Sequence, residues 1–153
     1  MLTPGGAIEP GSNSWRLAHG AAIVPGNEPF HVHDSADRNS LSLPSHSWAM
    51  TRRVCLDFLD PTIRFFVVNE GSLTTALKVV AYFRGGTGAL LGQTLVTTLL
   101  ATRTWAPTQP IPVLGNGAAP TGTKYVQFKF QPVGADSGWQ IDDVYVDPWF
   151  SKI

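Results

Sequence analysis

One stretch near the C-terminus decides the fold of this sequence: Trp139-Gln140-Ile141-Asp142-Asp143-Val144-Tyr145-Val146-Asp147-Pro148. Side chains alternate between the two faces of a β-strand, so Trp139 and Ile141 share one face. Val144 and Val146 share the other face. Burying all four requires one extra residue that shifts the alternation, so the pattern predicts a β-bulge at Asp142-Asp143. Such a bulge turns a carboxylate sideways, out of the hydrogen-bonded ladder of the closing strand.

The rest of the chain is divided into short runs by 12 Pro and 15 Gly, which is typical of antiparallel β proteins. The residues 77–84 alternate strictly, and this favours a strand over the alternative of a helix capped by Ser72. About ten strands are expected from such alternation and from the apolar run 64–68. The earlier and later segments are 15–17, 21–24, 40–43, 48–57, 77–84, 90–100 and 125–131. We therefore predict an all-β fold, an antiparallel two-sheet jelly-roll β-sandwich that occupies residues 1–153 as one domain.

The composition limits the classes of partner. Charged residues make up 14% of the chain, and 11 basic residues balance 11 acidic ones. Because the basic residues are scattered along the sequence, with Arg52-Arg53 the only adjacent pair, we do not expect nucleic-acid binding. A weakly charged surface does little to oppose self-association, which indicates an oligomer or a larger assembly.

Targeting and redox signals are sparse. Residues 1–6 lack the basic and apolar segments of a secretion signal. The apolar run 90–101 is far shorter than the ~20 residues of a membrane helix, so membrane insertion is not expected. The single cysteine, Cys55, lies in the apolar run 54–56 and is predicted to be a core residue. The alternative is a bond to a partner outside this chain.

Motifs for catalysis are weak. The glycine-rich segment 86–92 lacks the helix and the acid that a dinucleotide loop requires. His31 and His33, with Asp37 after them, resemble the first metal motif of the cupins, but no histidine follows His46 to complete that set. An ordinary polar pair of histidines is the favoured alternative. No Gly-x-Ser-x-Gly elbow occurs, and we predict that the protein is not an enzyme.

Two signatures carry a family resemblance. The opening, residues 6–15, contains a glycine, an apolar residue, Glu9, a glycine turn and Trp15, and it resembles the start of galactose-binding-like jelly rolls that serve as carbohydrate-binding modules. Residues 139–146 are similar to their last strand. A fuller resemblance, through residues 26–30, 64–66 and 139–148, is to an uncharacterised group of small actinobacterial proteins.

This resemblance implies two sites. A structural calcium often lies where the first and last strands of these modules meet, which points to Glu9 with Asp142 or Asp143. Calcium binds six to eight oxygens, and adjacent carboxylates supply them. The alternative is that these acids pair with arginines or accept backbone N–H groups. Ligands of these modules stack on exposed aromatic rings, for which the candidates are Trp48, Tyr82, Trp105, Tyr125 and Trp149.

Each of those aromatic residues can also be a packing residue, because tryptophan and tyrosine are usually well buried. Trp105 lies in a Pro-rich segment and Trp149 follows Asp147-Pro148, so these two are expected to be the most exposed.

Two functions remain as candidates for this chain. The first is a noncatalytic module that binds a glycan outside the cell, on a cell surface or on a virion. The second is a structural assembly protein, such as a coat, decoration or filament subunit.

Overall fold

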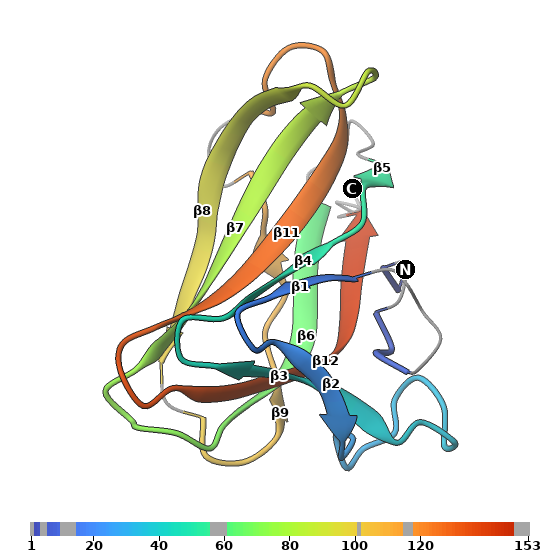
Figure 1. Ribbon diagram of the computed structural model, residues 1–153. Coiled ribbons are helices and arrows are strands. Elements are labelled where there is room, and N and C mark those ends of the chain that lie inside the picture. The colour runs from blue at the N-terminus through green and yellow to red at the C-terminus, as the bar shows by residue number, and fades with distance from the viewer. Residues whose placement is uncertain are drawn as a thin grey trace.

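The computed structural model describes residues 2–3, 6–9, 15–55, 61–100, 102–114 and 118–148. Within those residues the chain forms β-strands and no helix (Figure 1). The strands are β1 (Trp15–Ala18), β2 (Ala22–Pro25), β3 (Asn39–Pro44), β4 (Trp48–Thr51), β5 (Val54–Cys55), β6 (Pro61–Asn69), β7 (Ala76–Gly85), β8 (Leu90–Leu100), β9 (Ala106–Pro107), β10 (Ile111–Pro112), β11 (Thr123–Val133) and β12 (Gly138–Pro148). None of the described residues forms a helix long and apolar enough to cross a membrane.

The strands form two antiparallel six-stranded sheets. The first, called here the β11 sheet, has the order β1-β4-β11-β7-β8, with β5 also paired to β11. The second, the β12 sheet, has the order β10-β6-β12-β3-β2, with β9 also paired to β6. Figure 1 shows the two sheets as separate layers, with β6 and β12 behind β11. The predicted all-β two-sheet sandwich is confirmed.

The core lies between the sheets. Alternate residues of β11 and β7, among them Phe128 and Phe130, are fully buried against Trp139 and Ile141 of β12. Phe65 of β6 meets Phe130 edge to face, with ring centroids 5.1 Å apart. Such apolar burial contributes most of the stability of a sandwich of this size.

The bulge in β12 is confirmed. Asp142 pairs with Phe66 but Tyr145 pairs with Arg64, so three steps on β12 match two steps on β6. Asp143 adopts the left-handed region, with φ at 45°, which is uncommon for a residue with a side chain. The extra residue places the valines on the buried face, where Val144 is completely inaccessible.

Residues near the N-terminus pair with β12 beside this bulge. The backbone N–H of Thr3 donates to the Val144 carbonyl at 2.9 Å, and the Val144 N–H donates to the Gly6 carbonyl at 3.0 Å. A Cβ added at Gly6 would lie only 2.5 Å from the Val144 oxygen, so this close approach needs glycine. The two ends of the described chain are therefore joined by backbone hydrogen bonds.

The sheets differ in what covers their outer faces. In β6 every side chain except Arg64 is buried, which confirms the expectation that this strand is covered on both sides. Phe66 faces outward from the core and stacks on Phe30 of the β2–β3 loop, with ring centroids 5.6 Å apart. The outward side chains of β7 are instead half-buried, as are those of β11 from Tyr125 to Gln131.

Two sequence predictions need correction. Residues 48–57 do not form one strand, because β4 ends at Thr51 and β5 begins at Val54, with Arg52-Arg53 exposed between them. The prediction that Cys55 is a core residue is wrong, since its side chain is exposed. Alternation explains this: Val54 points into the core, so its neighbour Cys55 points outward, opposite Tyr125.

Candidate functional site

The outer face of the β11 sheet gathers three of the predicted aromatic residues, Tyr82, Tyr125 and Trp48. Tyr82 of β7 lies opposite Gln127 of β11, and Tyr125 of β11 lies opposite Arg84 of β7. Residues paired in this way point to the same face of an antiparallel sheet, so both tyrosines point outward together. All four side chains are half-buried. We call the outward-facing set Trp48, Tyr82, Arg84, Tyr125, Gln127 and Lys129 the tyrosine face.

The polar groups between the tyrosines are held in place. Gln127 donates from Nε2 to the Thr51 carbonyl at 2.9 Å, while its Oε1 accepts from Arg84 Nε at 2.5 Å. A second guanidinium nitrogen of Arg84 donates to the Gly88 carbonyl at 3.1 Å. These contacts fix both side chains before a ligand arrives, which reduces the entropy cost of binding.

Cations lie beside the aromatic rings of this face. The Arg53 guanidinium carbon is 5.9 Å from the centre of the Tyr125 ring. The rings of Trp48 are approached by Lys129 Nζ at 4.9 Å and by the Arg16 guanidinium carbon at 5.8 Å. The strand register thus brings together basic residues that are scattered along the sequence. Their wide spacing in the sequence did not indicate this gathering on one face.

A second arrangement lies on the opposite sheet, at the β12 bulge. We call Glu28, Asp37, Asp142 and Asp143 the acid cluster, because these four carboxylate side chains are buried close to one another. Asp142 accepts from the Glu28 N–H at 3.1 Å and from the Asp143 N–H at 2.8 Å. Glu28 accepts from the N–H groups of Phe30 at 2.6 Å and Val32 at 2.8 Å.

Asp143 is the exception in the acid cluster. Its side chain is completely inaccessible, and neither carboxylate oxygen has an N–H or hydroxyl donor among the described residues, although the Glu28 carboxyl lies close enough to share a proton with it. Ligand atoms of Asp143, Asp37 and His33 lie within 4.8 Å of one another. His33 Nδ1 is 2.7 Å from Asp37 Oδ2. An unpartnered buried carboxylate is costly, so this group of three residues is a candidate cation site.

The burial of these acids changes their proton affinities. Burial raises the pKa of Asp142 to about 8, although two backbone N–H groups donate to it. Burial, followed by the neighbouring Glu28 carboxyl, raises the pKa of Asp143 to about 7. The hydrogen bond to Asp37 raises the pKa of the His33 imidazole. Within the acid cluster, negative charge is therefore disfavoured unless a positive group neutralises it.

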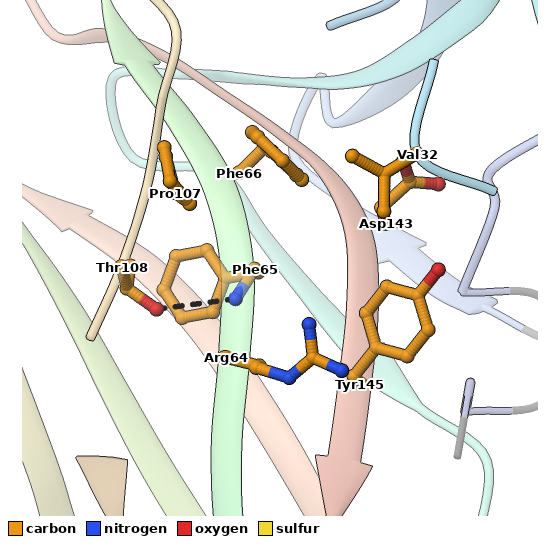
Figure 2. A pocket seen from close by; sticks show the side chains of 8 residues that line it. All are labelled: Val32, Arg64, Phe65, Phe66, Pro107, Thr108, Asp143 and Tyr145. Carbon is orange, nitrogen blue, oxygen red and sulfur yellow. Dashed lines mark hydrogen bonds between the residues drawn. The ribbon is translucent and has the colours of Figure 1, made fainter. Parts of the chain in front are cut away.

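A small pocket opens next to Asp143 on the outer face of the β12 sheet (Figure 2). Its volume is about 180 Å³, and Phe66, Pro107 and Tyr145 are among the residues that line it. Figure 2 shows the Tyr145 hydroxyl pointing toward the end of the pocket where Asp143 lies beneath Val32. Arg64 covers the Tyr145 ring at 4.4 Å and binds Asp147 at 2.7 Å, so its charge is already engaged.

The remaining predicted residues are dispersed. Glu9 accepts hydrogen bonds from the N–H groups of Arg38 and Asn39 at 2.7 and 2.9 Å, and it is not part of the group formed by Asp143, Asp37 and His33. Trp105 is half-buried next to β9, which pairs with β6 of the other sheet, so it does not join the tyrosines. Trp149 lies outside the described residues.

Some residues of both sites were absent from the sequence prediction. Gln127 and Arg84 share the parity of Tyr125 and Tyr82, so alternation alone was a sufficient signal for their common face. Glu28 belongs to a loop, where no periodicity reports which way a side chain points. The two histidines also lie in that loop rather than on a strand, so the cupin-like spacing of His31 and His33 has no structural counterpart.

Comparison with known proteins bears on the fold. No protein-family model and no curated protein matches the sequence. Among solved structures, the C-terminal family 22 carbohydrate-binding module of Clostridium thermocellum Xyn10B matches over 97% of this chain and 93% of its own, with a TM-score of 0.61 and 12% identity. The CBM22-1 xylan-binding domain of Paenibacillus barcinonensis Xyn10C matches over 94% and 90%, with a TM-score of 0.58 and 13% identity. This chain shares their fold.

The same fold occurs inside larger proteins. The enzymatically active domain of bacteriophage CBA120 tailspike protein 4 matches over 90% of this chain at a TM-score of 0.60 and 15% identity, and this chain spans 20% of that protein. The two modules described above match over most of both chains and are named for carbohydrate or xylan binding. These structural matches establish the β-sandwich fold. Because the sequence identities are so low, the ligand must be inferred from the residues of the site.

Proposed function

We propose that this protein is a noncatalytic module that binds a glycan chain on the tyrosine face. The observation that carries the proposal is the pair of tyrosines on one outward face, with Gln127 and Arg84 fixed between them. Sugar rings offer apolar C–H faces that stack on aromatic rings, and their hydroxyls need oriented donors and acceptors. The tyrosine face supplies both.

Two further observations support this function. The matched modules carry names that describe carbohydrate or xylan binding, and they share the arrangement of two packed sheets. The tyrosine face runs along the neighbouring strands β7 and β11, which suits an extended polymer. Glycan chains of this kind are found outside cells, so we assign the protein to the extracellular space, a cell surface or a virion.

The test is a binding panel of soluble polysaccharides, measured by affinity electrophoresis and calorimetry. Tyr125→Ala and Tyr82→Ala are each expected to weaken binding by about tenfold, since stacking on one aromatic ring contributes about 1 kcal/mol or more. Trp105→Ala on the other sheet is the matched control and is expected to bind like the parent. Retention of full affinity by the double tyrosine variant would contradict the proposed site.

We also propose that the acid cluster holds a cation, which is the metal expected from the family resemblance but on a different residue set. The fit rests on Asp143, whose two buried oxygens have no N–H or hydroxyl donor among the described residues. Asp143 and Asp37 would bind the ion, with His33 as the third ligand. A divalent ion there neutralises the buried carboxylates and ties the β2–β3 loop to the β12 bulge.

Thermal unfolding with and without a chelator tests this cation site. Calcium, manganese and zinc added to chelator-treated protein should each be tried, and at least one should raise Tm by several degrees. A calcium effect that survives His33→Gln indicates an all-oxygen site, whereas a zinc or manganese effect that requires His33 indicates a nitrogen ligand. No change in Tm with any of the three ions would refute the proposal.

Assembly is the second candidate function, and strand β8 favours it. This strand lies at the end of the β11 sheet, so one of its edges has no neighbouring strand in that sheet. Leu90, Leu95 and Leu100 are 52%, 57% and 69% exposed along it, and its eleven residues include no charge. Natural edge strands usually carry charges that prevent pairing with another chain. Light scattering of the parent and of Leu95→Lys tests this, with a shift from dimer to monomer as the expected result.

A further inference from the structure

The charge of this protein is separated between its two sheets. Five basic side chains lie on the tyrosine face or beside it, and none of them forms an ion pair in the part of the chain that the structure describes. They are Arg16, Arg53, Lys78, Arg84 and Lys129. The acid cluster lies on the other sheet, and there the half-buried Arg64 of β6 is paired with Asp147. A formal net charge of zero therefore conceals a basic face.

No acid offsets these cations among the outward-facing residues of the described strands. Outward positions of β4, β7, β8 and β11 carry aromatic, amide, apolar and basic side chains and no aspartate or glutamate. Neutral glycan ligands would need no such excess of positive charge. A face that keeps five cations unpaired instead matches a ligand that brings its own negative charges.

Four of the five cations form two groups along β11. Arg53 lies over the Tyr125 ring and Arg84 is the cross-strand neighbour of Tyr125, while Arg16 and Lys129 lie over the Trp48 ring. Tyr125 and Lys129 are four residues apart, which is about 13 Å along an extended strand. Gln127 lies between the two groups and is held by Thr51 and Arg84. Each group places one ring beside two positive charges.

We propose that the ligand of the tyrosine face is an acidic polysaccharide, a polymer whose sugar rings carry carboxylates. Its rings would stack on Tyr125 and Trp48 while its carboxylates bind the arginines and Lys129, in charge-assisted hydrogen bonds stronger than neutral ones. This inference rests on the proposed glycan-binding function and names the class of glycan. Nucleic acid is the weaker match, because the chain has no net positive charge to attract a dense row of phosphates.

The experiment compares one polymer in two charge states. Polygalacturonate is tested against the same polymer after methyl esterification, which removes the carboxylate charge and keeps the backbone. The acidic form is expected to bind at least about tenfold more tightly, and the difference should shrink at high salt. Neutral xylan and a single-stranded oligothymidylate complete the panel.

Variants identify the residues responsible. Arg53→Gln/Lys129→Gln removes one cation from each group and should bring the affinity for polygalacturonate down to that for the esterified polymer. Arg103→Gln is the matched control, since this exposed arginine lies in a loop away from the tyrosine face and donates to the Gly71 carbonyl. The control is expected to bind like the parent, and thermal unfolding should show that all variants are folded.

The possible failures are distinct. Equal binding of acidic and esterified polymers, with no effect of the double variant, would overturn the acidic ligand and leave glycan binding intact. Binding of no polysaccharide at all would overturn both proposals. Binding of the oligothymidylate as tightly as polygalacturonate would show a general polyanion surface and would also overturn the inference.

Discussion

The outer faces of the two sheets have the same strand geometry but opposite chemistry. On the β11 sheet the outward side chains of β7 and β11 are half-buried, and the basic ones lack acid partners. On the β12 sheet the β2–β3 loop packs over the strands, so Phe66 is only 6% exposed and the carboxylates beside it are fully buried. One face is open to a long ligand, and the other is closed around its own polar groups.

The difference between the open and the covered face explains why a polymer-binding surface arises on one sheet and a buried acid cluster on the other. An open sheet face offers a repeating array of side chains, which suits a polymer that contacts several strands. On a covered face the outward side chains of the strands are buried as well. A carboxylate buried there is stable only if it is protonated, hydrogen-bonded or bound to a cation. The bulge of β12 is what directs Asp143 into the covered side.

Deleting Asp143 is expected to have the largest effect, because it removes the bulge that distinguishes β12. Without the extra residue, the side-chain alternation after Asp142 inverts, and Val144 and Val146 would point away from the core. The expected cost exceeds about 4 kcal/mol, enough to leave the protein unfolded or aggregated on expression. Asp143→Gly is the control: it keeps the residue count and suits the positive φ, and it should fold with cooperative unfolding in urea. A folded deletion variant with native-like circular dichroism would contradict the assigned register.

The two faces should also respond differently when one outward aromatic ring is removed. Phe66→Ala leaves a cavity under Phe30 and is expected to cost about 3 kcal/mol, because its ring is buried. Tyr82→Ala removes a half-buried ring from an open face and should cost about 1 kcal/mol or less. Urea unfolding of both variants measures the contrast. Similar costs for the two would show that the faces are equally covered.

The side-chain alternation within the strands was predictable, since burial allows few solutions. Trp139, Ile141, Val144 and Val146 fit one core only with a bulge, and that bulge is observed. The common face of Tyr82 and Tyr125 follows from the same alternation once β7 and β11 are paired. The prediction for Cys55 was wrong because a short apolar run was taken to be buried throughout, although only one of its two parities faces the core.

The acid cluster was not predictable in the same way. Glu28, His33 and Asp37 belong to the irregular segment between β2 and β3, and no period links them to β12 more than a hundred residues later. The gathering of cations was hidden for a related reason. Arg16, Arg53 and Lys129 are distant in sequence, and only the order β1-β4-β11 brings them to the same two rings.

Replacing the buried carboxylate of Asp143 by an amide removes a negative charge from the covered face. In chelator-treated protein at pH 8, above its pKa of about 7, Asp143 is charged at a cost in burial. Asp143→Asn should then be more stable than the parent by at least about 1 kcal/mol. At pH 5 the carboxyl is protonated in the folded state but still ionised in the unfolded state, so the difference should shrink, and it should vanish only below about pH 4. Thermal unfolding at the two pH values measures this, with Asp136→Asn in an exposed loop as the control. A difference that grows toward pH 5 would contradict the charge assignment.

The smallest effect on stability is expected at Cys55, and the accessibility of its thiol reports directly on the open face. Because this side chain is exposed opposite Tyr125, Cys55→Ser should change the free energy of unfolding by less than about 0.5 kcal/mol. A small maleimide should label the native thiol at nearly the rate of the urea-unfolded protein. The bound glycan should slow that labelling, since the thiol lies beside a ring that we propose the glycan covers. Protection by polygalacturonate but not by its methyl ester would tie the cysteine, Tyr125 and the charged ligand to one surface. Fast labelling that saturating ligand leaves unchanged would place the ligand elsewhere than beside Tyr125.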